Sequence, residues 1–386
     1  MVSWAVRQGL MTAFSFIGFV LVSIPLYWHM EAWNVGCVLY ILWTAVACLI
    51  NFINLNVWRN TAVNMAPGWC DFSIRMTFVA PIGIIAAAMV ISRRLCKIAT
   101  GNTVTSTRRD KRRAIMIDLA IGLAPPLAQF IIFFFIQGHR FDIFEGIGCQ
   151  PAVPNTILFM VLYGCWPIAM GLVSAFYCVM TLRAFIRRRK QFSELIASNS
   201  NLTFNRYFRL MAMAVIEMLS TVPLGIYTIV GNVQIGIYQW KGFADLHSGF
   251  DRVRQFPLAF WQETWDDASK RSLEFNQWAF VVCALVFFLI FGMAEEAKKH
   301  YRAAYTSVAK RVGLSTGAIE SSGFGFSQSK ESKFTSSGFG RVTIPTFIQR
   351  NASKRDSLTS FSVSCWIFIG LEYILELARR QGSEGI

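Results

Sequence analysis

Charged residues are scarce in this chain of 386 amino acids, and their scarcity excludes most classes of soluble protein. Only 15% of the residues are charged, whereas globular proteins average about 25%. Hydrophobic residues make up 54%, and the apolar runs reach the length of about 20 residues that a helix needs to cross a bilayer. Runs such as VCALVFFLIFGM lack the period-two alternation of a membrane β-barrel. The sequence therefore predicts an integral membrane protein made of helices.

Motifs for metal binding, nucleic-acid binding and catalysis are also missing. The nine cysteines include no CxxC pair and the four histidines are far apart, so we expect no metal site and no cofactor. The net charge of +15 would suggest nucleic acid in a soluble protein, but here it fits cytoplasmic loops that face anionic lipid. An intramembrane enzyme needs catalytic side chains at helical spacing, and the sequence has no such set. We therefore expect neither an enzyme nor a nucleic-acid-binding protein.

Seven apolar segments are long enough to span a membrane. They cover about residues 9–29, 34–56, 72–92, 114–136, 156–182, 208–232 and 275–294. The first is too long for a cleavable signal peptide and should remain as a span. The connections at 93–113 and 183–209 hold eight and seven Lys or Arg residues, and such residues concentrate on the cytoplasmic side. This predicts an all-α bundle of seven transmembrane helices with its N-terminus outside and its C-terminus in the cytoplasm.

The domain organisation follows from this topology. We expect a short extracellular N-terminus (1–8), a seven-helix domain (9–294) and a cytoplasmic tail (295–386). The tail repeats SSGFG and is rich in Ser, Gly and Lys, which predicts disorder. Near its end, FSVSCWIFIGLEYILELARR is too short to span before its first Glu, so it favours an amphipathic helix at about 363–380.

Two classes of membrane protein remain. A transporter usually has internal repeats or a polar pathway at mid-membrane, but the halves of this chain are not similar and Glu217 is its single acid at that depth. A sensor needs an outer ligand face, a bundle and basic inner loops, and the pattern suits this class. A transporter of a small solute or peptide stays the alternative.

Several segments carry a resemblance to a known family. They are WCDFSIRMTFVAPIGIIAAAMVISRRL (69–95), QGHRFDIFEGIGCQP (137–151), YFRLMAMA (207–214) and FFLIFGMAEEAKKHY (287–301). Together they resemble the fungal lipopeptide mating-pheromone receptors, the a-factor type in class D of the G-protein-coupled receptors. The resemblance implies a multi-pass receptor of the plasma membrane that binds a farnesylated peptide, activates a heterotrimeric G protein and forms homodimers. The chain lacks the Asp-Arg-Tyr and Asn-Pro-x-x-Tyr patterns of rhodopsin-like receptors, so their switch residues cannot be transferred.

The polar segment 137–151 is predicted to lie outside and to hold the ligand. Outside the cell a cysteine can persist in a disulfide, and Cys70 is the only other cysteine that the topology places on the same side as Cys149. We therefore expect these two to pair and to fix the segment over the mouth of the bundle. The candidate ligand contacts are Trp69, Arg75, His139, Arg140, Phe141, Asp142 and Glu145. Alternatively, the charged residues only solvate a loop, with Arg140 pairing with Asp142 or Glu145.

Signalling residues are predicted at the inner face and in the sixth span. The candidate G-protein contacts are Arg93, Arg94, the run RRDKRR (108–113), Arg187, Arg188, Arg189 and Lys190. Positive inner charges occur in most membrane proteins, so topology alone could explain them. In the sixth span, Pro223 permits a bend, and the costly acid Glu217 lies six residues away. Glu217 either locks the inactive state or makes a polar contact that only helps the bundle pack.

Overall fold

The computed structural model describes residues 3–100, 108–187, 204–294, 297–298 and 301–302. Two compact units divide the chain, Met1–Ala303 and Ala304–Ile386, and the second lies outside the described residues. The predicted disorder of the tail and its amphipathic helix therefore stay predictions. All that follows concerns the first unit.

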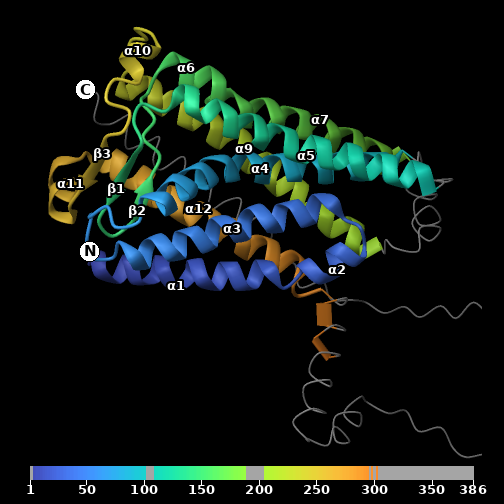
Figure 1. Ribbon diagram of the computed structural model, residues 1–386. Coiled ribbons are helices and arrows are strands. Elements are labelled where there is room, and N and C mark those ends of the chain that lie inside the picture. Colours follow the sequence, from blue (N-terminus) through green and yellow to red (C-terminus); the bar gives the residue numbers. More distant parts are fainter. Residues whose placement is uncertain (1–2, 101–107, 188–203, 295–296, 299–300, 303–386) are drawn as a thin grey trace, which may run out of the picture. The chain divides into compact units, whose positions relative to one another are not determined.

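Seven helices in the described part of the chain are long and apolar enough to cross a membrane, which confirms the predicted bundle (Figure 1). They are α1 (Trp4–Ser23) with α2 (Leu26–Glu31), α3 (Val35–Val57), α4 (Pro67–Ala99), α5 (Arg108–Ile136), α6 (Ile157–Phe159) with the π-helix η1 (Met160–Gly164) and α7 (Cys165–Arg187), α9 (Phe204–Ile235) and α12 (Asp267–Phe291). Most are longer than the predicted spans. The 33 residues of α4, for example, exceed the roughly 20 that cross the hydrocarbon core, because the helix continues beyond it.

The first predicted span is interrupted near its C-terminal end. Pro25 has no N–H to donate, and α1 ends at Ser23 before α2 begins at Leu26. A tight turn then leads into α3, and Trp33 in this turn takes a left-handed φ of 54°, which is uncommon for a residue other than glycine. The short connection thus makes α1 and α3 antiparallel neighbours.

Helix α4 is the centre of the bundle. It packs against α3, α5, α7 and α9, and 72% of the residues in its apolar stretch are buried. Its core face is rich in alanine and includes Gly83, where an added Cβ would lie 2.5 Å from the indole ring of Trp43. Small residues let neighbouring helices approach closely in membranes, so this face explains the central position of α4.

A small β-sheet closes one end of the bundle and was not predicted. Strands β1 (Phe141–Phe144) and β2 (Gly148–Gln150) form an antiparallel hairpin, and β3 (Val253–Phe256) pairs with β1 in parallel. The hairpin turn needs Gly146, whose φ is 85°. The short helices α10 (Phe243–Leu246) and α11 (Leu258–Thr264) flank β3 in the same connection between α9 and α12. Figure 1 shows the sheet at the end of the bundle where the N-terminus lies, with α2 at the opposite end.

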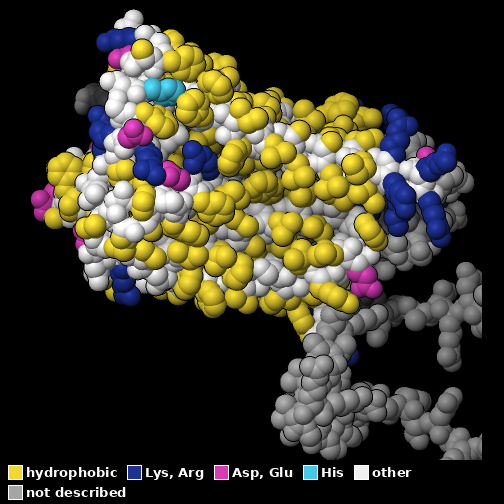
Figure 2. Space-filling model, in the orientation of Figure 1, with side chains coloured by type: hydrophobic (Ala, Val, Ile, Leu, Met, Phe, Trp, Pro, Cys, Tyr) yellow, Lys and Arg dark blue, Asp and Glu magenta, His cyan; other side chains and the backbone are white. Residues whose placement is uncertain are grey.

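The surface of this unit is divided as a membrane protein requires. A broad band of apolar side chains covers the middle of the face in Figure 2, and Lys and Arg gather at the end away from the sheet. Large apolar residues of the membrane helices are well exposed, such as Ile131 of α5 (65%) and Phe176 of α7 (62%). Apolar patches of this extent are rare on soluble monomers, so we assign the band to contact with lipid.

Candidate functional site

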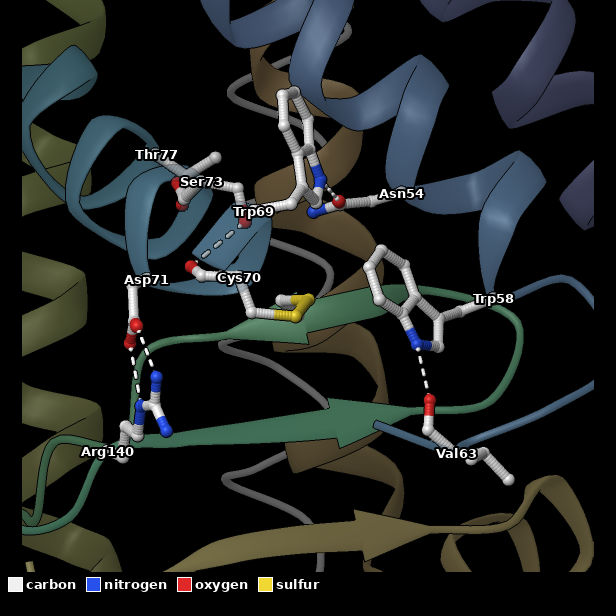
Figure 3. The surroundings of a disulfide bond; sticks show 10 residues. Asn54, Trp58, Val63, Trp69, Cys70, Asp71, Ser73, Thr77 and Arg140 are labelled. Carbon is white, nitrogen blue, oxygen red and sulfur yellow. Dashed lines mark hydrogen bonds and ion pairs between the residues drawn. A yellow bond between two sulfur atoms is a disulfide. The ribbon is translucent and has the colours of Figure 1, made fainter. Parts of the chain in front are cut away.

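A disulfide holds the sheet on the bundle (Figure 3). Cys70, in the first turns of α4, is bonded to Cys149 in β2, and their Cα atoms are 5.4 Å apart. This is the pair that the sequence predicts. Both cysteines are fully buried in an apolar cluster with Phe141 and Ile143 of β1. We call the β2–β1–β3 sheet with its hairpin turn the lid, because it covers this end of the helices.

An ion pair beside the disulfide adds a second attachment. The guanidinium of Arg140 donates to both carboxylate oxygens of Asp71, at 3.1 and 2.6 Å (Figure 3). These hydrogen bonds raise the pKa of Arg140 above its ordinary value. Arg140 also lies over the ring of Phe141, 5.4 Å from its centroid. The sequence suggested partners within the loop, but the structure pairs Arg140 with α4. Asp71 was missed, although its place next to Cys70 was a usable signal.

The remaining ligand candidates also have partners within the protein. His139 lies 2.7 Å from Asp142, and Glu145 accepts a hydrogen bond from the N–H of Leu258 at 2.9 Å. Phe141 is fully buried. On α4, Trp69 donates to Asn54 at 2.8 Å, and Arg75 donates to the backbone of Asp71 at 2.8 Å. The structure therefore uses these residues to build the lid and its seat, and their contact with a ligand stays a prediction.

The attachment by Arg140 gives a testable stability difference. Replacing Arg140 with Asp should lower the free energy of unfolding by about 1 kcal/mol or less, because the pair is partly exposed. The reversed pair, with Asp71→Arg added, should recover most of this loss. Thermal unfolding in detergent compares the purified wild type, Arg140→Asp and the reversed pair. Arg252→Asp, at an exposed position of the neighbouring loop, is the control. No recovery in the reversed pair would show that the two side chains do not interact.

At the opposite end, two consecutive arginines of α4 bind neighbouring elements. Arg93 forms an ion pair with Asp118 of α5, and only 13% and 9% of these side chains are exposed. Arg94 donates to the carbonyl of Trp33, in the turn between α2 and α3, at 2.7 Å. The residues of RRDKRR at the start of α5 are all exposed. Of the other candidates, Arg187 ends α7 and is exposed, whereas 188–190 lie outside the described residues.

A polar contact between two ionisable side chains joins spans that are distant in the sequence. The hydroxyl of Tyr40, on α3, donates to Glu217, on α9, at 2.6 Å. Tyr40 is fully buried, and its ring is stacked on Phe287 of α12 with centroids 5.1 Å apart. Pro223 lies within α9, as predicted. The contact joins three helices, and the sequence did not identify Tyr40.

Known proteins similar to this chain are pheromone receptors. The family model described as Pheromone A receptor matches residues 10–312. The Pheromone B alpha 3 receptor of Schizophyllum commune is 39% identical over 357 residues, covering 91% of this chain and 56% of the relative. Pheromone receptor 1 of Mycosarcoma maydis is 31% identical over 295 residues, covering 76% and 82%. The Pheromone a factor receptor of Saccharomyces cerevisiae is 27% identical over 288 residues, covering 73% and 58%.

The region matched by the family model begins within α1 and contains the other six membrane helices of the described residues and the lid. The chain spans a little over half the length of the Schizophyllum commune relatives named alpha 3 and alpha 1. Among the described residues, no three His, Cys, Asp or Glu side chains are placed to hold a metal ion. The seven apolar helices and the family match lead to one conclusion: the chain is a multi-pass membrane protein that belongs to the fungal pheromone receptor family, whose members are receptors and not enzymes.

Proposed function

We propose that this chain is a G-protein-coupled receptor of the plasma membrane that binds an extracellular farnesylated peptide pheromone and activates a heterotrimeric G protein. The observation that carries the proposal is the lid, which a disulfide attaches to one end of an apolar seven-helix bundle whose other end is basic. A disulfide persists in an oxidising compartment, which supports an extracellular lid and N-terminus. The homodimer that the resemblance implies stays a prediction.

The ligand would meet two kinds of surface at the lid. The polar residues His139, Arg140, Asp142 and Glu145 lie in or beside β1, where they could exchange their present partners for groups of a peptide. Trp69 and Phe141 belong to the apolar cluster beneath the lid. After the lid shifts, they would contact the farnesyl group or apolar side chains of the peptide. Arg75, nearly two turns of α4 beyond Trp69, would extend the polar surface.

The test is a reporter assay in cells that lack their own pheromone receptor. Synthetic peptides ending in S-farnesyl cysteine should activate the reporter, and the same peptides without the farnesyl group should be much weaker. A response to neither, together with solute flux in vesicles that contain the purified protein, would identify a transporter instead.

The inner contact surface can be tested separately. Replacing Arg108, Arg109, Lys111, Arg112 and Arg113 with Gln should reduce the maximal reporter signal at least tenfold, because clustered cations steer acidic partners. Surface amount and peptide binding should be unchanged. The control removes Lys241, Arg252 and Arg271, which are exposed at the lid end. Wild-type signalling by the inner variant would leave these charges with a role in topology alone.

Other inner candidates belong to the same proposed surface. Arg187 continues it from α7, and Arg188, Arg189 and Lys190 follow in sequence. Arg94 is held by the α2–α3 turn. Arg93 is bonded to Asp118, so it would reach a G protein only after this ion pair separates.

A further inference from the structure

The lid has an open edge at β3. In the strand order β2–β1–β3, no strand of the described residues pairs with the second side of β3. The N–H of Glu145 donates to the C=O of Phe256 at 3.0 Å, so Phe256 directs its backbone groups towards β1. Successive residues of a strand direct these groups to alternate sides, so Val253 and Gln255 direct theirs outward. Two residues therefore present donors and acceptors to an incoming chain.

Gln255 shows where this edge lies on the bundle. It is paired with Ile143 of β1, and paired residues point to the same face of a sheet. Ile143 is fully buried in the cluster around the disulfide, on the face towards the helices, whereas Gln255 is exposed. On the same face of β3, Val253 still packs against this cluster, so β3 is seated on the bundle at Val253 and is open to solvent at Gln255.

We propose that the outward edge of β3 binds the peptide part of the pheromone in an extended conformation, as a fourth strand of the lid. The inference rests on the proposed function, because it requires a peptide ligand. Backbone groups that repeat every second residue are complementary to another extended backbone, and strand addition is a recurring mode of peptide recognition. Successive side chains of the peptide would then point to opposite faces of the extended sheet.

A second copy of the chain is the competing occupant, and the sequence of β3 disfavours it. In the twofold pairing of β3 edges that uses both outward residues, Val253 of each copy would pair with Gln255 of the other. The two copies of Arg254 would then lie directly opposite, and like charges at that position are destabilising. A peptide ligand has no such constraint.

The decisive variant is Gln255→Pro. Proline removes the outward N–H of this residue and leaves the hydrogen bonds to β1 in place, and edge strands tolerate it. The probe is the farnesylated peptide with the lowest EC50 on the wild-type receptor in the reporter assay. Its EC50 should rise about fivefold or more, as expected for one lost hydrogen bond. Gln255→Ala keeps the N–H and should stay within about twofold, since an exposed side chain contributes little.

A peptide scan on the wild-type receptor tests the same geometry without any receptor variant. Each residue of the probe is N-methylated in turn, and the loss of potency should alternate along the part that pairs with β3. Equal EC50 values for Gln255→Pro and Gln255→Ala at equal surface amounts, or a scan without alternation, would overturn the inference while the proposed function stands. A wild-type receptor that no peptide activates would overturn both. Conversion of a detergent-solubilised dimer into a monomer by Gln255→Pro would assign the edge to a second copy and reject peptide addition.

Discussion

Replacing Cys70 and Cys149 together with serine is expected to remove most of the receptor from the cell surface. The disulfide closes a loop with a sequence separation of 79 residues, and chain-entropy estimates for such a loop give about 4 kcal/mol. That is a large part of the 5–15 kcal/mol that typically stabilises a domain. Without the bond, the lid keeps only non-covalent attachments, among them the Asp71–Arg140 ion pair, apolar packing and the hydrogen bond from the N–H of Gly146 to the carbonyl of Trp58. Flow cytometry of an N-terminally tagged receptor measures the surface fraction.

Substituting each cysteine singly distinguishes an effect of losing the disulfide from an effect of losing one particular thiol. Cys70→Ser and Cys149→Ser should each cost about as much as the double substitution, because either one breaks the same bond. Cys165→Ser, at an exposed cysteine of α7, is the matched control and should behave as wild type. Peptide mapping without reduction gives the direct answer. Free thiols at both positions in surface-expressed receptor would contradict the pairing.

The spans and the disulfide could be predicted because their signals are local or few. A helix that crosses lipid must be apolar over its whole length, so seven runs were visible without any knowledge of contacts. Once the topology was assigned, only Cys70 and Cys149 remained on the outer side. The break at Pro25 could not be predicted with the same certainty from the proline alone, because prolines inside membrane helices are usually tolerated, as Pro81 is in α4.

The sheet could not be predicted in the same way. Its strands have three or four residues and lie in two connections more than 100 residues apart. A strand of this length has no periodic pattern that distinguishes it from a loop. Glu145 illustrates the consequence: the sequence showed a polar residue near a cysteine, and the structure shows a carboxylate that caps the N–H of Leu258 beyond β3. Charges that looked available for a ligand are partly the means by which the lid satisfies its own polar groups.

The partner of Glu217 was hidden for a related reason. Periodicity can show which face of a helix is buried, but it does not say which neighbouring helix meets that face. Tyr40 lies 177 residues away in sequence, on α3. Its position in the apolar cluster of α3, α9 and α12 gives the predicted lock a concrete form, a hydrogen bond that must break if α9 moves away from α3.

Tyr40→Phe is expected to raise signalling in the absence of pheromone. The substitution keeps the ring stacked on Phe287 and removes only the hydroxyl that donates to Glu217. A hydrogen bond to a carboxylate contributes about 1.5–3 kcal/mol, and losing it changes a two-state equilibrium about 13- to 160-fold. If the bond exists only in the inactive state, basal reporter activity per surface receptor should rise by a factor in this range. Glu217→Gln should have a smaller effect in the same direction, because the amide oxygen can still accept from Tyr40.

The competing interpretation is that the contact persists in both states and only helps the helices pack. Tyr40→Phe would then lower the unfolding temperature in detergent and leave basal signalling per receptor unchanged. Tyr163→Phe is the matched control, because Tyr163 also donates from a membrane helix, to the carbonyl of Phe78 at 3.1 Å, but its bond joins η1 to α4 and not α3 to α9. A rise in basal activity with Tyr40→Phe and not with Tyr163→Phe would assign the effect to the α3–α9 contact. The double variant of Tyr40 and Glu217 should not exceed the larger single effect, because both changes remove one shared interaction, and an additive rise would show that the two residues act separately.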